Sequence, residues 1–593
     1  MTGLLPAIQP DAIRTSNTRY MEMEATRASA PDRDSAWSDI ALLCLIFGVL
    51  CFHGLGETML VNPDEGRYAE VPREMVASGD YVTPRLNGVL YFEKPPLMYW
   101  AIAGFIRVFG PGELAVRAVP ALFALAGVLI AYGTARRFEG RLAGLATAIV
   151  LGSSLLYFAL GRILLLDMAV SVLIAATLFC FILGVREPAE SSTSSRGMRR
   201  WFFYGLYFSA ALATLAKGLI GFLLPGAVMF FWLLIFNQWS RLRPLYLPSG
   251  IALFLAVAAP WHVLIAQRNP AWSHFYFIRE HWQRFTTTEH GRIEPWWYFI
   301  PIIAVGLFPW TGALWGGVRR GIAGGWRERH KNADAWFFVT WAIFLFLFFS
   351  KSQSKLMPYI LPVFPPLAVL MGTWLAEVWL RKDFSRIRGT LWTFCLAALV
   401  LGIAVAVVLL RPGLVADAAK LAPLRGGGLS ASAMLLAGAV GVAWMIRRQQ
   451  PRGALLCLVI SVAAFYLCLA SLQHAIVRPG TKAFALTVRD QIRPGDRVYH
   501  YHDFFHDFTY YAGQPVGTVA ALNTELELWI DPQAQASGRF IDDAEFFRQW
   551  AGPNRLWVVA RKRAVDGKLF SDPGFRYHLL GETATHYLFS NQP

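Results

Sequence analysis

Long apolar runs separated by short basic stretches restrict the possible fold more than any other feature of this sequence. The runs are about 18 to 22 residues long, which is the length that an α-helix needs to cross the hydrocarbon core of a bilayer. Hydrophobic residues make up 55% of the 593 residues and charged residues only 16%, whereas a soluble domain is about one quarter charged. We therefore expect an all-α polytopic membrane protein.

The basic residues stand mostly at the ends of the apolar runs. The formal net charge of +16 would raise the question of nucleic-acid binding in a soluble protein. Here the pattern follows the positive-inside rule, so we attribute the charge to topology and expect no nucleic-acid partner. All six cysteines lie inside apolar runs without metal-ligand spacing, which indicates small apolar residues rather than structural disulfides.

Alternation of the runs across the membrane, with the basic N-terminus inside, predicts about 13 transmembrane helices. The segment Pro96–Gly110 is apolar but too short to cross, so we expect a helix along the outer surface. If it did cross, the later basic loops would all lie outside. The predicted spans are Asp39–Leu60, Leu114–Ala135, Leu142–Leu160, Met168–Val185, Trp201–Ala216, Leu219–Phe236, Leu247–Ala266, Trp296–Val318, Ala335–Ser350, Leu356–Leu380, Thr390–Leu410, Leu429–Ile446 and Gly453–Leu472.

The sequence divides into three parts. Residues 1–38 are polar, lack a signal peptide and are expected to form a disordered cytoplasmic tail, with Met21 or Met23 as alternative starts. Residues 39–473 form the transmembrane domain, and residues 474–593 alternate turns with β-like runs and a helical stretch near Asp542–Ala551, which predicts a small outer α/β domain. The β-like runs are Arg497–Tyr501, Leu556–Ala560, Tyr577–Leu580 and Thr585–Ser590.

The first outer loop contains the most unusual group of polar residues. Pro63 can open a helix, which places Asp64 in the first turn, where the helix dipole favours a carboxylate. Arg67 and Tyr68 follow three and four positions later on the same face. This arrangement fits a base or electrostatic stabiliser beside a phosphate anchor, and it equally fits a capping Asp with a surface ion pair.

Two further outer segments carry isolated charges. In Tyr91–Pro96 the two prolines favour an extended chain, which predicts that Glu93 and Lys94 point to opposite sides; the alternative is a turn with solvated charges. Asp167 follows four apolar residues and needs a cationic partner, for which Arg67, Lys94 and Arg162 are the candidates. Lys217 is likewise an isolated charge at the end of an apolar run, and as a cation it needs an anionic partner. The alternative is a snorkelling lysine at the membrane interface.

Candidate histidines occur in two segments, one in the long outer loop and one in the C-terminal part. His281 and Arg284 stand one helical turn apart, and His281 fits a base, a metal ligand or an ordinary hydrogen-bonding residue. In the C-terminal part, His500, His502 and His506 alternate with other residues, and we interpret them as a half-exposed strand rather than a metal site.

The sequence has neither a phosphate-binding Gly-x-x-x-x-Gly-Lys-Ser/Thr loop nor a dinucleotide-binding Gly-x-Gly-x-x-Gly motif between a strand and a helix. We therefore expect no nucleotide, and a group donor at the outer face would be carried by a lipid. Basic groups suited to phosphates lie on that side: Arg67, Lys94, Lys217, Arg284 and Lys355.

Three motifs together resemble a known family. Asn62–Tyr68, Tyr91–Pro96 and Glu280–Phe285 are similar to segments of the membrane glycosyltransferases that use polyprenyl-phosphate sugars, the GT-C superfamily that includes the protein O-mannosyltransferases. In particular they resemble the bacterial undecaprenyl-phosphate 4-amino-4-deoxy-L-arabinose transferases, which modify lipid A. The resemblance implies a GT-C fold with surface helices in the first periplasmic loop and a periplasmic C-terminal α/β domain.

The resemblance also implies a reaction and a set of roles. It implies inverting transfer of aminoarabinose from undecaprenyl phosphate to a lipid A phosphate at the periplasmic face of the bacterial inner membrane. The resulting cell would resist polymyxin and cationic peptides, and the protein would act as a monomer among membrane lipids. The implied catalytic residues are Asp64 and Asp167; the phosphate-binding residues are Arg67, Lys94, Lys217, Arg284 and Lys355; the substrate-positioning residues are Tyr68, Tyr91, Glu93 and Tyr359; and Glu93 with His281 would hold a zinc or magnesium ion.

The acceptor decides what Asp64 does. A phosphate acceptor needs no base, so Asp64 would orient Arg67 or stabilise positive charge at the anomeric carbon. A hydroxyl of a protein or another glycan would make Asp64 the general base, and this acceptor is the first alternative. The second alternative is a non-enzymatic transporter of lipid-linked sugars, which usually has charges at mid-membrane and two related halves; the sequence has neither.

Overall fold

The computed structural model describes residues 33–187, 193–283, 294–411, 418–476, 480–521 and 526–593. It divides into two compact units, residues 1–48 and 49–593, which are described separately. Helix α2 (Arg33–Phe52) contains the boundary between them. Most of the predicted tail lies outside the described residues. The helix begins at Arg33 rather than at Asp39, because no proline or glycine interrupts the segment between them.

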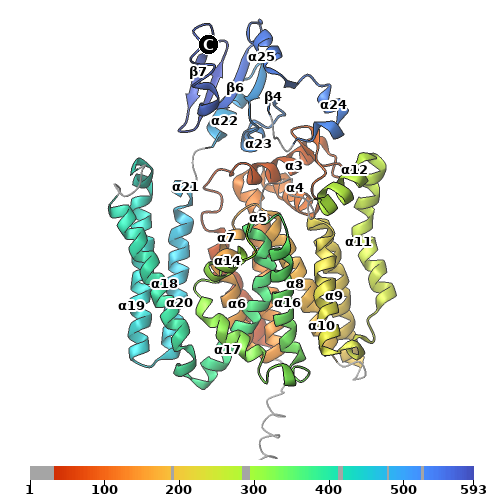
Figure 1. Cartoon of the computed structure of the whole chain (residues 1–593), viewed down its shortest axis with the longest axis vertical. Helices are drawn as coiled ribbons and strands as arrows, with labels where there is room; N and C mark the ends of the chain where they lie inside the picture. The colour runs from red at the N-terminus through yellow and green to blue at the C-terminus, as the bar shows by residue number, and fades with distance from the viewer. Residues whose placement is uncertain (1–32, 188–192, 284–293, 412–417, 477–479, 522–525) are drawn as a thin grey trace, which may run out of the picture. The chain divides into compact units, whose positions relative to one another are not determined.

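Apolar helices build most of the second unit (Figure 1). Every predicted span after the first overlaps a helix or an interrupted helix. In the described part, nine helices of the chain are long and apolar enough to cross a membrane, or up to ten if a bent pair is one span; the number 13 stays a prediction. The helices of the second unit that overlap the predicted spans are α5 (Glu113–Glu139), α6 (Arg141–Gly152) with α7 (Leu155–Leu160), α8 (Leu166–Arg186), α9 (Thr193–Lys217), α10 (Ile220–Phe236), α11 (Leu247–Arg268), α14 (Phe299–Gly306) with α15 (Leu314–Gly321), α16 (Ala333–Lys351), α17 (Phe364–Arg381), α18 (Phe384–Leu410), α19 (Arg425–Arg447) and α20 (Pro451–Ser471).

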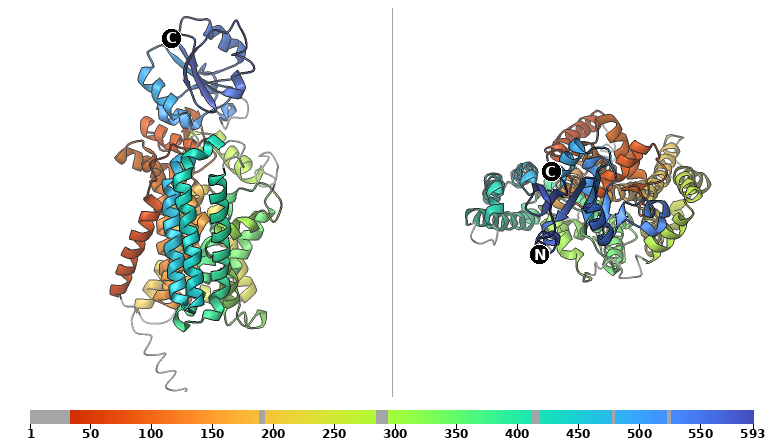
Figure 2. Two further views of the ribbon diagram at one scale, coloured as in Figure 1. Left: turned by 90° about the vertical axis from the view of Figure 1, so that its left-hand side faces the viewer. Right: turned by 90° about the horizontal axis from the view of Figure 1, so that it is seen from above.

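The span predicted over Trp296–Val318 is sharply bent in the structure. Helices α14 and α15 meet at 106°, across a segment that holds Pro309 and Gly312, residues that interrupt helices. Beyond the bend, a Cβ on Gly317 would lie 2.8 Å from the backbone nitrogen of Met371, so α15 packs directly on the backbone of α17. Helices α18, α19 and α20 stand side by side at one edge (Figure 2).

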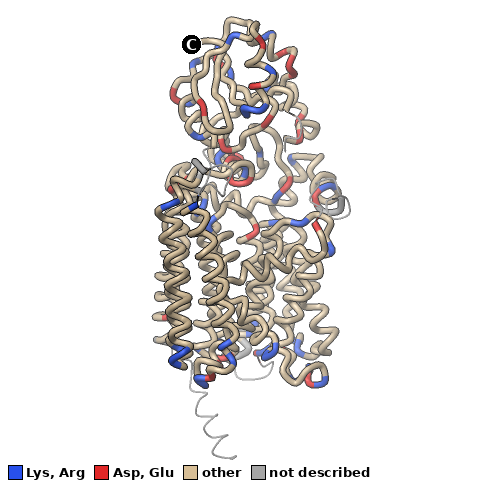
Figure 3. The backbone as a smooth tube through the Cα atoms, turned by 60° about the vertical axis from the view of Figure 1, so that its left-hand side comes forward, with Lys and Arg blue, Asp and Glu red and all other residues tan. Residues whose placement is uncertain are grey.

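Lys and Arg residues gather at the helix ends that lie away from the C-terminal domain (Figure 3). The opposite ends are covered by the first loop, which forms α3 (Asp64–Ser78), β1 (Arg85–Leu86), β2 (Val89–Leu90) and α4 (Leu97–Phe109). In Figure 1, α3 and α4 lie across these ends, beneath the sheet. The short helix predicted at Pro96–Gly110 is confirmed as α4, whose 13 residues span only about 20 Å.

The C-terminal part is a small α/β domain, as predicted. Its six-stranded sheet has the order β5-β4-β3-β6-β8-β7; neighbours pair in parallel from β5 to β6, and β8 is antiparallel to both β6 and β7. All four β-like runs are strands, whereas β4, β5, α22 and α23 were not predicted. The elements are α22 (Lys482–Gln491), β3 (Arg497–Tyr501), α23 (His506–Ala512), β4 (Gly517–Val519), α24 (Pro532–Gln535), β5 (Phe540–Ile541), α25 (Asp543–Trp550), β6 (Leu556–Arg561), α26 (Lys562–Val565), β7 (His578–Glu582) and β8 (His586–Ser590).

The prediction of a half-exposed histidine strand is wrong. His500 on β3 is completely buried, and its Nδ1 accepts a hydrogen bond from the backbone N–H of Phe505. Burial lowers the pKa of His500 to about 3, so it is a neutral core residue. His506 is also buried and begins α23 instead of continuing the strand. The turn after Tyr501 breaks the alternation on which the prediction depended.

Helix α3 is held tightly by the C-terminal domain. A Cβ on Gly66 would lie 2.5 Å from the backbone nitrogen of Asp507, so only glycine allows α3 and α23 to approach this closely. The side-chain oxygen of Asn62 accepts a hydrogen bond of 2.9 Å from the backbone N–H of His506. Asp507 is buried and accepts bonds from the N–H and hydroxyl of Thr481. The helix that carries Asp64 is therefore fixed by a domain far away in the sequence.

Candidate active site

A cavity of about 160 Å³ opens near the loop-covered ends of α8, α9, α10 and α16. We call it the first cavity. Its wall combines apolar side chains from the helices with five charged residues and one tyrosine, which come from five separate segments. Those residues are Glu93, Lys94, Asp167, Lys217, Glu280 and Tyr359. Five of the six were predicted as site residues, and the sixth, Glu280, belongs to the third motif.

Asp167 and Lys217 form an ion pair in the wall of this cavity. Asp167 lies in the first turn of α8 and Lys217 is the last residue of α9, so each charge has the sign that its helix end favours. Their side chains are only 13% and 14% exposed. The Lys217 ammonium also lies 4.5 Å from the centroid of the Tyr359 ring, a cation–π contact.

This pairing corrects the prediction that Asp167 would pair with Arg67, Lys94 or Arg162. Arg162 is buried and donates instead to the backbone carbonyls of Leu50, Cys51 and His53. It satisfies carbonyls at the end of α2, where the helix has no partners of its own. Arg162 therefore has a structural role.

Glu93 and Lys94 point to the same cavity, so the prediction of opposite sides is wrong. Lys94 Nζ lies 2.9 Å from Glu280 Oε2 and 3.6 Å from Glu93 Oε2. The backbone bends at Glu93 and Lys94 instead of remaining extended, and this bend turns both side chains inward. Lys94 thus joins the first loop to the segment that contains Glu280.

Asp64 forms the predicted ion pair with Arg67 on α3 but does not line the first cavity. The side chain of Asp64 is 53% exposed, whereas that of Arg67 is 7% exposed. The Arg67 guanidinium stacks 4.8 Å from the centroid of the Tyr68 ring. Asp64 therefore presents an open carboxylate beside a fixed guanidinium.

Two buried tyrosines, Tyr68 on α3 and Tyr91 in the first loop, are both affected by the charge of Glu93 in the first cavity. Burial raises the pKa of Tyr68, which also experiences the charges of Arg67, Asp64, Glu93 and Asp167. Burial likewise raises the pKa of Tyr91; the charge of Glu93 adds to this shift and the charge of Arg67 opposes it. The Tyr91 hydroxyl has no hydrogen-bond partner among the described residues. These shared electrostatic neighbours link the Asp64–Arg67 pair to the cavity.

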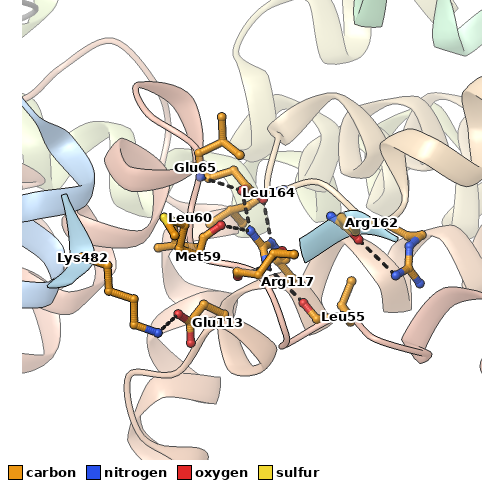
Figure 4. A network of polar contacts seen from close by, with 12 residues as sticks. Leu55, Met59, Leu60, Glu65, Glu113, Arg117, Arg162, Leu164 and Lys482 are labelled. Atoms are coloured by element: carbon orange, nitrogen blue, oxygen red, sulfur yellow. Dashed lines mark hydrogen bonds and ion pairs between the residues drawn. The ribbon is translucent and has the colours of Figure 1, made fainter. Parts of the chain in front are cut away.

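Glu65 holds the start of α3 in place, a role that the sequence did not reveal. Its carboxylate binds Arg117 of α5 through two contacts of 2.8 and 2.7 Å (Figure 4). It also accepts hydrogen bonds from the backbone N–H groups of Val61 and Leu164. Arg117 stands inside an apolar run, and such a buried cation was a signal that could have been followed.

The remaining predicted site residues are Lys355, Arg284 and His281, and only the side chain of Lys355 is described. Lys355 is buried and donates to the backbone carbonyl of Glu294 at 2.8 Å, so that carbonyl takes the place of the expected phosphate. Arg284 lies outside the described residues. His281 lies in the π-helix Phe275–Gln283, but its side chain is not among those described.

The predicted metal site can be tested against its carboxylates. Lys94 contacts both Glu93 and Glu280, and an ammonium group so placed competes with a divalent ion. Among the described residues, no group of three or more His, Cys, Asp or Glu side chains is arranged to hold a metal. The described donors do not fit a metal ion by themselves, and the reaction proposed below uses none.

Comparisons with known proteins agree with this geometry. A family model described as dolichyl-phosphate-mannose-protein mannosyltransferase matches residues 93–263. Two curated relatives are both named undecaprenyl phosphate-alpha-4-amino-4-deoxy-L-arabinose arabinosyl transferase. The protein from Edwardsiella ictaluri is 32% identical over 339 residues, which are 57% of this chain and 59% of the relative. The protein from Yersinia enterocolitica is 33% identical over 344 residues, which are 57% of this chain and 60% of the relative.

Solved structures extend the likeness over almost the whole chain. The crystal structure of ArnT from Cupriavidus metallidurans bound to undecaprenyl phosphate has a TM-score of 0.79 and 27% sequence identity; the likeness covers 93% of this chain and 98% of that one. The apo structure of the same protein has a TM-score of 0.77, also at 27% identity, and covers 94% of this chain and 98% of that one.

The fold, the cavity and these likenesses define a class. The chain is a multi-pass membrane protein with the GT-C fold of the polyprenyl-phosphate-dependent glycosyltransferases, so the resemblance found in the motifs is confirmed. Its sequence is similar to the two undecaprenyl phosphate aminoarabinose transferases reported above. The matched segments span 59% and 60% of the length of these two curated relatives.

Proposed function

We propose that this protein transfers 4-amino-4-deoxy-L-arabinose from undecaprenyl phosphate to a phosphate of lipid A. A phosphate oxygen of lipid A attacks the anomeric carbon, the bond from that carbon to the carrier phosphate breaks, and the configuration inverts. The product carries a cationic amine on lipid A, which weakens the attraction of polymyxin and other cationic peptides.

The observation that carries this proposal is the mixed charge of the first cavity. Lys94 and Lys217 provide two ammonium groups suited to the carrier phosphate. The carboxylates of Glu93, Asp167 and Glu280 outnumber them by one. The donor has a protonated amine on its sugar and an anionic phosphate. The carboxylates of this wall complement the amine, and its ammonium groups complement the phosphate.

An apolar groove supports a lipid-linked donor. The groove has a volume of about 580 Å³ and lies between α10 and α16, with aromatic and aliphatic side chains such as Phe231, Phe344 and Leu347. Phe348 lines both this groove and the first cavity. If the carrier phosphate lies beside Lys217, its isoprenoid chain can therefore lie in this apolar groove.

The arrangement of α3 favours an acceptor role for the Asp64–Arg67 pair. Arg67 is held between Asp64 and Tyr68, and a fixed guanidinium suits bidentate binding of the acceptor phosphate. Because a phosphate is already ionised, Asp64 orients Arg67 and stabilises positive charge on the sugar in the transition state. Tyr68, Tyr91 and Tyr359 position the substrates around it.

We also propose a location for the protein in the cell. Basic helix ends are typical of the cytoplasmic side, so the first cavity and the C-terminal domain face the periplasm and the helices cross the bacterial inner membrane. We further propose that the protein acts as a monomer.

A hydroxyl of a protein or glycan is the second candidate acceptor, and one observation favours it. Asp64 is half exposed and so remains accessible as a general base. The mannosyltransferase description of the matching family model points in the same direction.

Mass spectrometry of lipid A tests the proposal. Cells that make the donor and carry the gene should gain lipid A species heavier by one aminoarabinosyl group. Asp64→Asn should abolish these species while the protein remains folded in the membrane, and Arg388→Gln, an exposed change far from the site, should preserve them. Unmodified lipid A together with newly glycosylated periplasmic protein would refute the lipid A acceptor and support the hydroxyl acceptor.

A further inference from the structure

A second charged cavity lies at the opposite ends of the helices that form the first one. Its volume is about 360 Å³. On α16 the second cavity is lined by Asp334 and the first by Phe349, which are 15 residues apart, or about 22 Å along a helix. On α8 the corresponding residues are Arg186 and Asp167. The groove proposed for the isoprenoid chain extends along α16 as far as Trp336, but the second cavity shares no lining residue with that groove or with the first cavity.

Cations outnumber carboxylates around the second cavity. Asp334 is shared by Arg241, at 2.5 Å, and Arg186, at 3.6 Å. Arg320 binds Glu139 and also contacts Glu377 at 2.9 Å. Lys331 adds a fourth cation to the lining; its side chain is 76% exposed and its ammonium lies 3.1 Å from Glu328, which is outside the lining. Glu139 and Asp334 are the carboxylates of the lining. The lining therefore carries two more positive than negative charges.

These cations differ from ordinary basic loop residues in where they point. Arg319 and Arg388 are exposed near the same helix ends and do not line the cavity. Arg241 and Arg320 are only 28% and 27% exposed and converge on one hollow. Topology alone requires positive charge at this end but does not require it to surround a cavity.

The remaining wall of the second cavity is amphipathic. Asn332, Gln238 and Thr373 add neutral hydrogen-bonding groups. Phe138 and Phe338 add an apolar side, and the Arg186 guanidinium lies 3.9 Å from the centroid of the Phe138 ring. A basic pocket between helices with an apolar side is the kind of surface that receives an acidic lipid head group.

We propose that the second cavity binds the anionic phosphoryl group of a membrane phospholipid. Arginine forks match phosphate oxygens with two parallel hydrogen bonds, and the amide and hydroxyl groups suit the ester oxygens or a glycerol hydroxyl. A soluble phosphate ester offers the same chemistry from a different source. The site is separate from the proposed transfer, so binding here stands or falls without that activity.

Native mass spectrometry of the full-length protein in detergent tests this site. The protein is titrated with phosphatidylglycerol and, separately, with phosphatidylcholine of the same acyl chains. The test variant is Arg241→Gln with Lys331→Gln, and the matched control is Arg319→Gln with Arg388→Gln, which removes the same charge outside the cavity. We expect the test variant to bind phosphatidylglycerol at least about tenfold more weakly, since two charge-assisted contacts are lost, and the control to match the unaltered protein.

Each outcome decides the proposal. Equal binding of the two lipids by the unaltered protein, or equal loss in both double variants, would overturn it. Competition by millimolar glycerol 3-phosphate would support the phosphoryl site with a soluble ester as its source, whereas lack of competition would support the lipid. Lys331→Gln alone, a change at a side chain that is 76% exposed, should keep the fold and still weaken lipid binding.

Discussion

Lys217 at the end of α9 neutralises Asp167 at the start of α8, and both charges lie in the wall of the first cavity. Each residue stands at the helix end whose dipole favours its charge. The pair is stable without substrate, and it leaves Asp167 dependent on a single lysine in a largely apolar wall. Substitutions at this ion pair therefore test its contribution to protein stability and its contribution to activity.

Lys217→Met should lower the melting temperature, because the Asp167 carboxylate would remain in the wall without its cation. Breaking such a pair costs about 3–5 kcal/mol when it is fully buried, and the partial exposure here reduces this to about 1–3 kcal/mol. Asp167→Asn combined with Lys217→Met should recover part of the loss, while both variants stay inactive. Thermal unfolding in detergent measures this, and an unchanged melting temperature for Lys217→Met would contradict the dependence of Asp167 on it.

Glu65→Gln and Asp64→Asn should have opposite effects although the residues are neighbours. Glu65 holds Arg117 and two backbone N–H groups in a buried network, so its loss should destabilise the protein by about 3 kcal/mol. Asp64 is half exposed, and its ion pair contributes at most about 1 kcal/mol. Thermal unfolding and lipid A modification, measured on both variants, should show an unstable Glu65→Gln and a stable but inactive Asp64→Asn.

Gly66→Ala should disturb the docking of the C-terminal domain on α3, because the added methyl group would meet the backbone of Asp507. We expect faster amide hydrogen exchange in α3 and α23 and a large loss of activity. Gly104→Ala on α4 is the matched control, since nothing lies within 4 Å of a Cβ there. Unchanged exchange in α3 of Gly66→Ala would mean that the interface adjusts without cost.

Glu74 on α3 should make stability depend on pH. Burial raises its pKa to about 8 from the ordinary 4.5, and the charge of Glu70 adds to the shift. The folded protein therefore binds a proton that the unfolded chain releases between pH 4.5 and about 8, so this contribution to stability is complete below pH 4.5 and is lost as pH rises through 8. Melting temperatures across this range should fall with rising pH, and Glu74→Gln should flatten the slope; identical slopes would disprove the role of Glu74.

Glu93→Gln and Glu280→Gln should change which sugar is accepted. Each removes one carboxylate that we place near the sugar amine, so transfer of the amino sugar should fall while transfer of a neutral pentose from the same carrier should fall less. Competition between the two donors in proteoliposomes measures the ratio. A parallel loss for both donors would assign these carboxylates to holding Lys94 alone.

The sequence predicted the membrane fold and most of the charged residues of the first cavity. Helix length, basic inner ends and apolar composition follow from bilayer physics, which acts on each segment separately. Lys94, Asp167 and Lys217 were recognisable for the same reason, because a charge in an apolar setting requires an explanation.

The pairings were not predictable, because they depend on tertiary contacts. Asp167 and Lys217 are 50 positions apart, and Glu65 and Arg117 are 52 apart. The inward turn of Glu93 depends on a local bend that the flanking prolines did not reveal. The approach of α23 to Gly66 joins distant parts of the chain and leaves no local pattern in either segment.

The contact between α3 and α23 also forms late in the synthesis of the chain. Asn62 binds the backbone of a residue 444 positions later, so α3 leaves the ribosome long before its partner exists. Until the last part of the chain has been made and folded, the helix that bears Asp64 lacks its final support. Any activity that needs a fixed α3 therefore begins only after the C-terminal domain has been made and has folded.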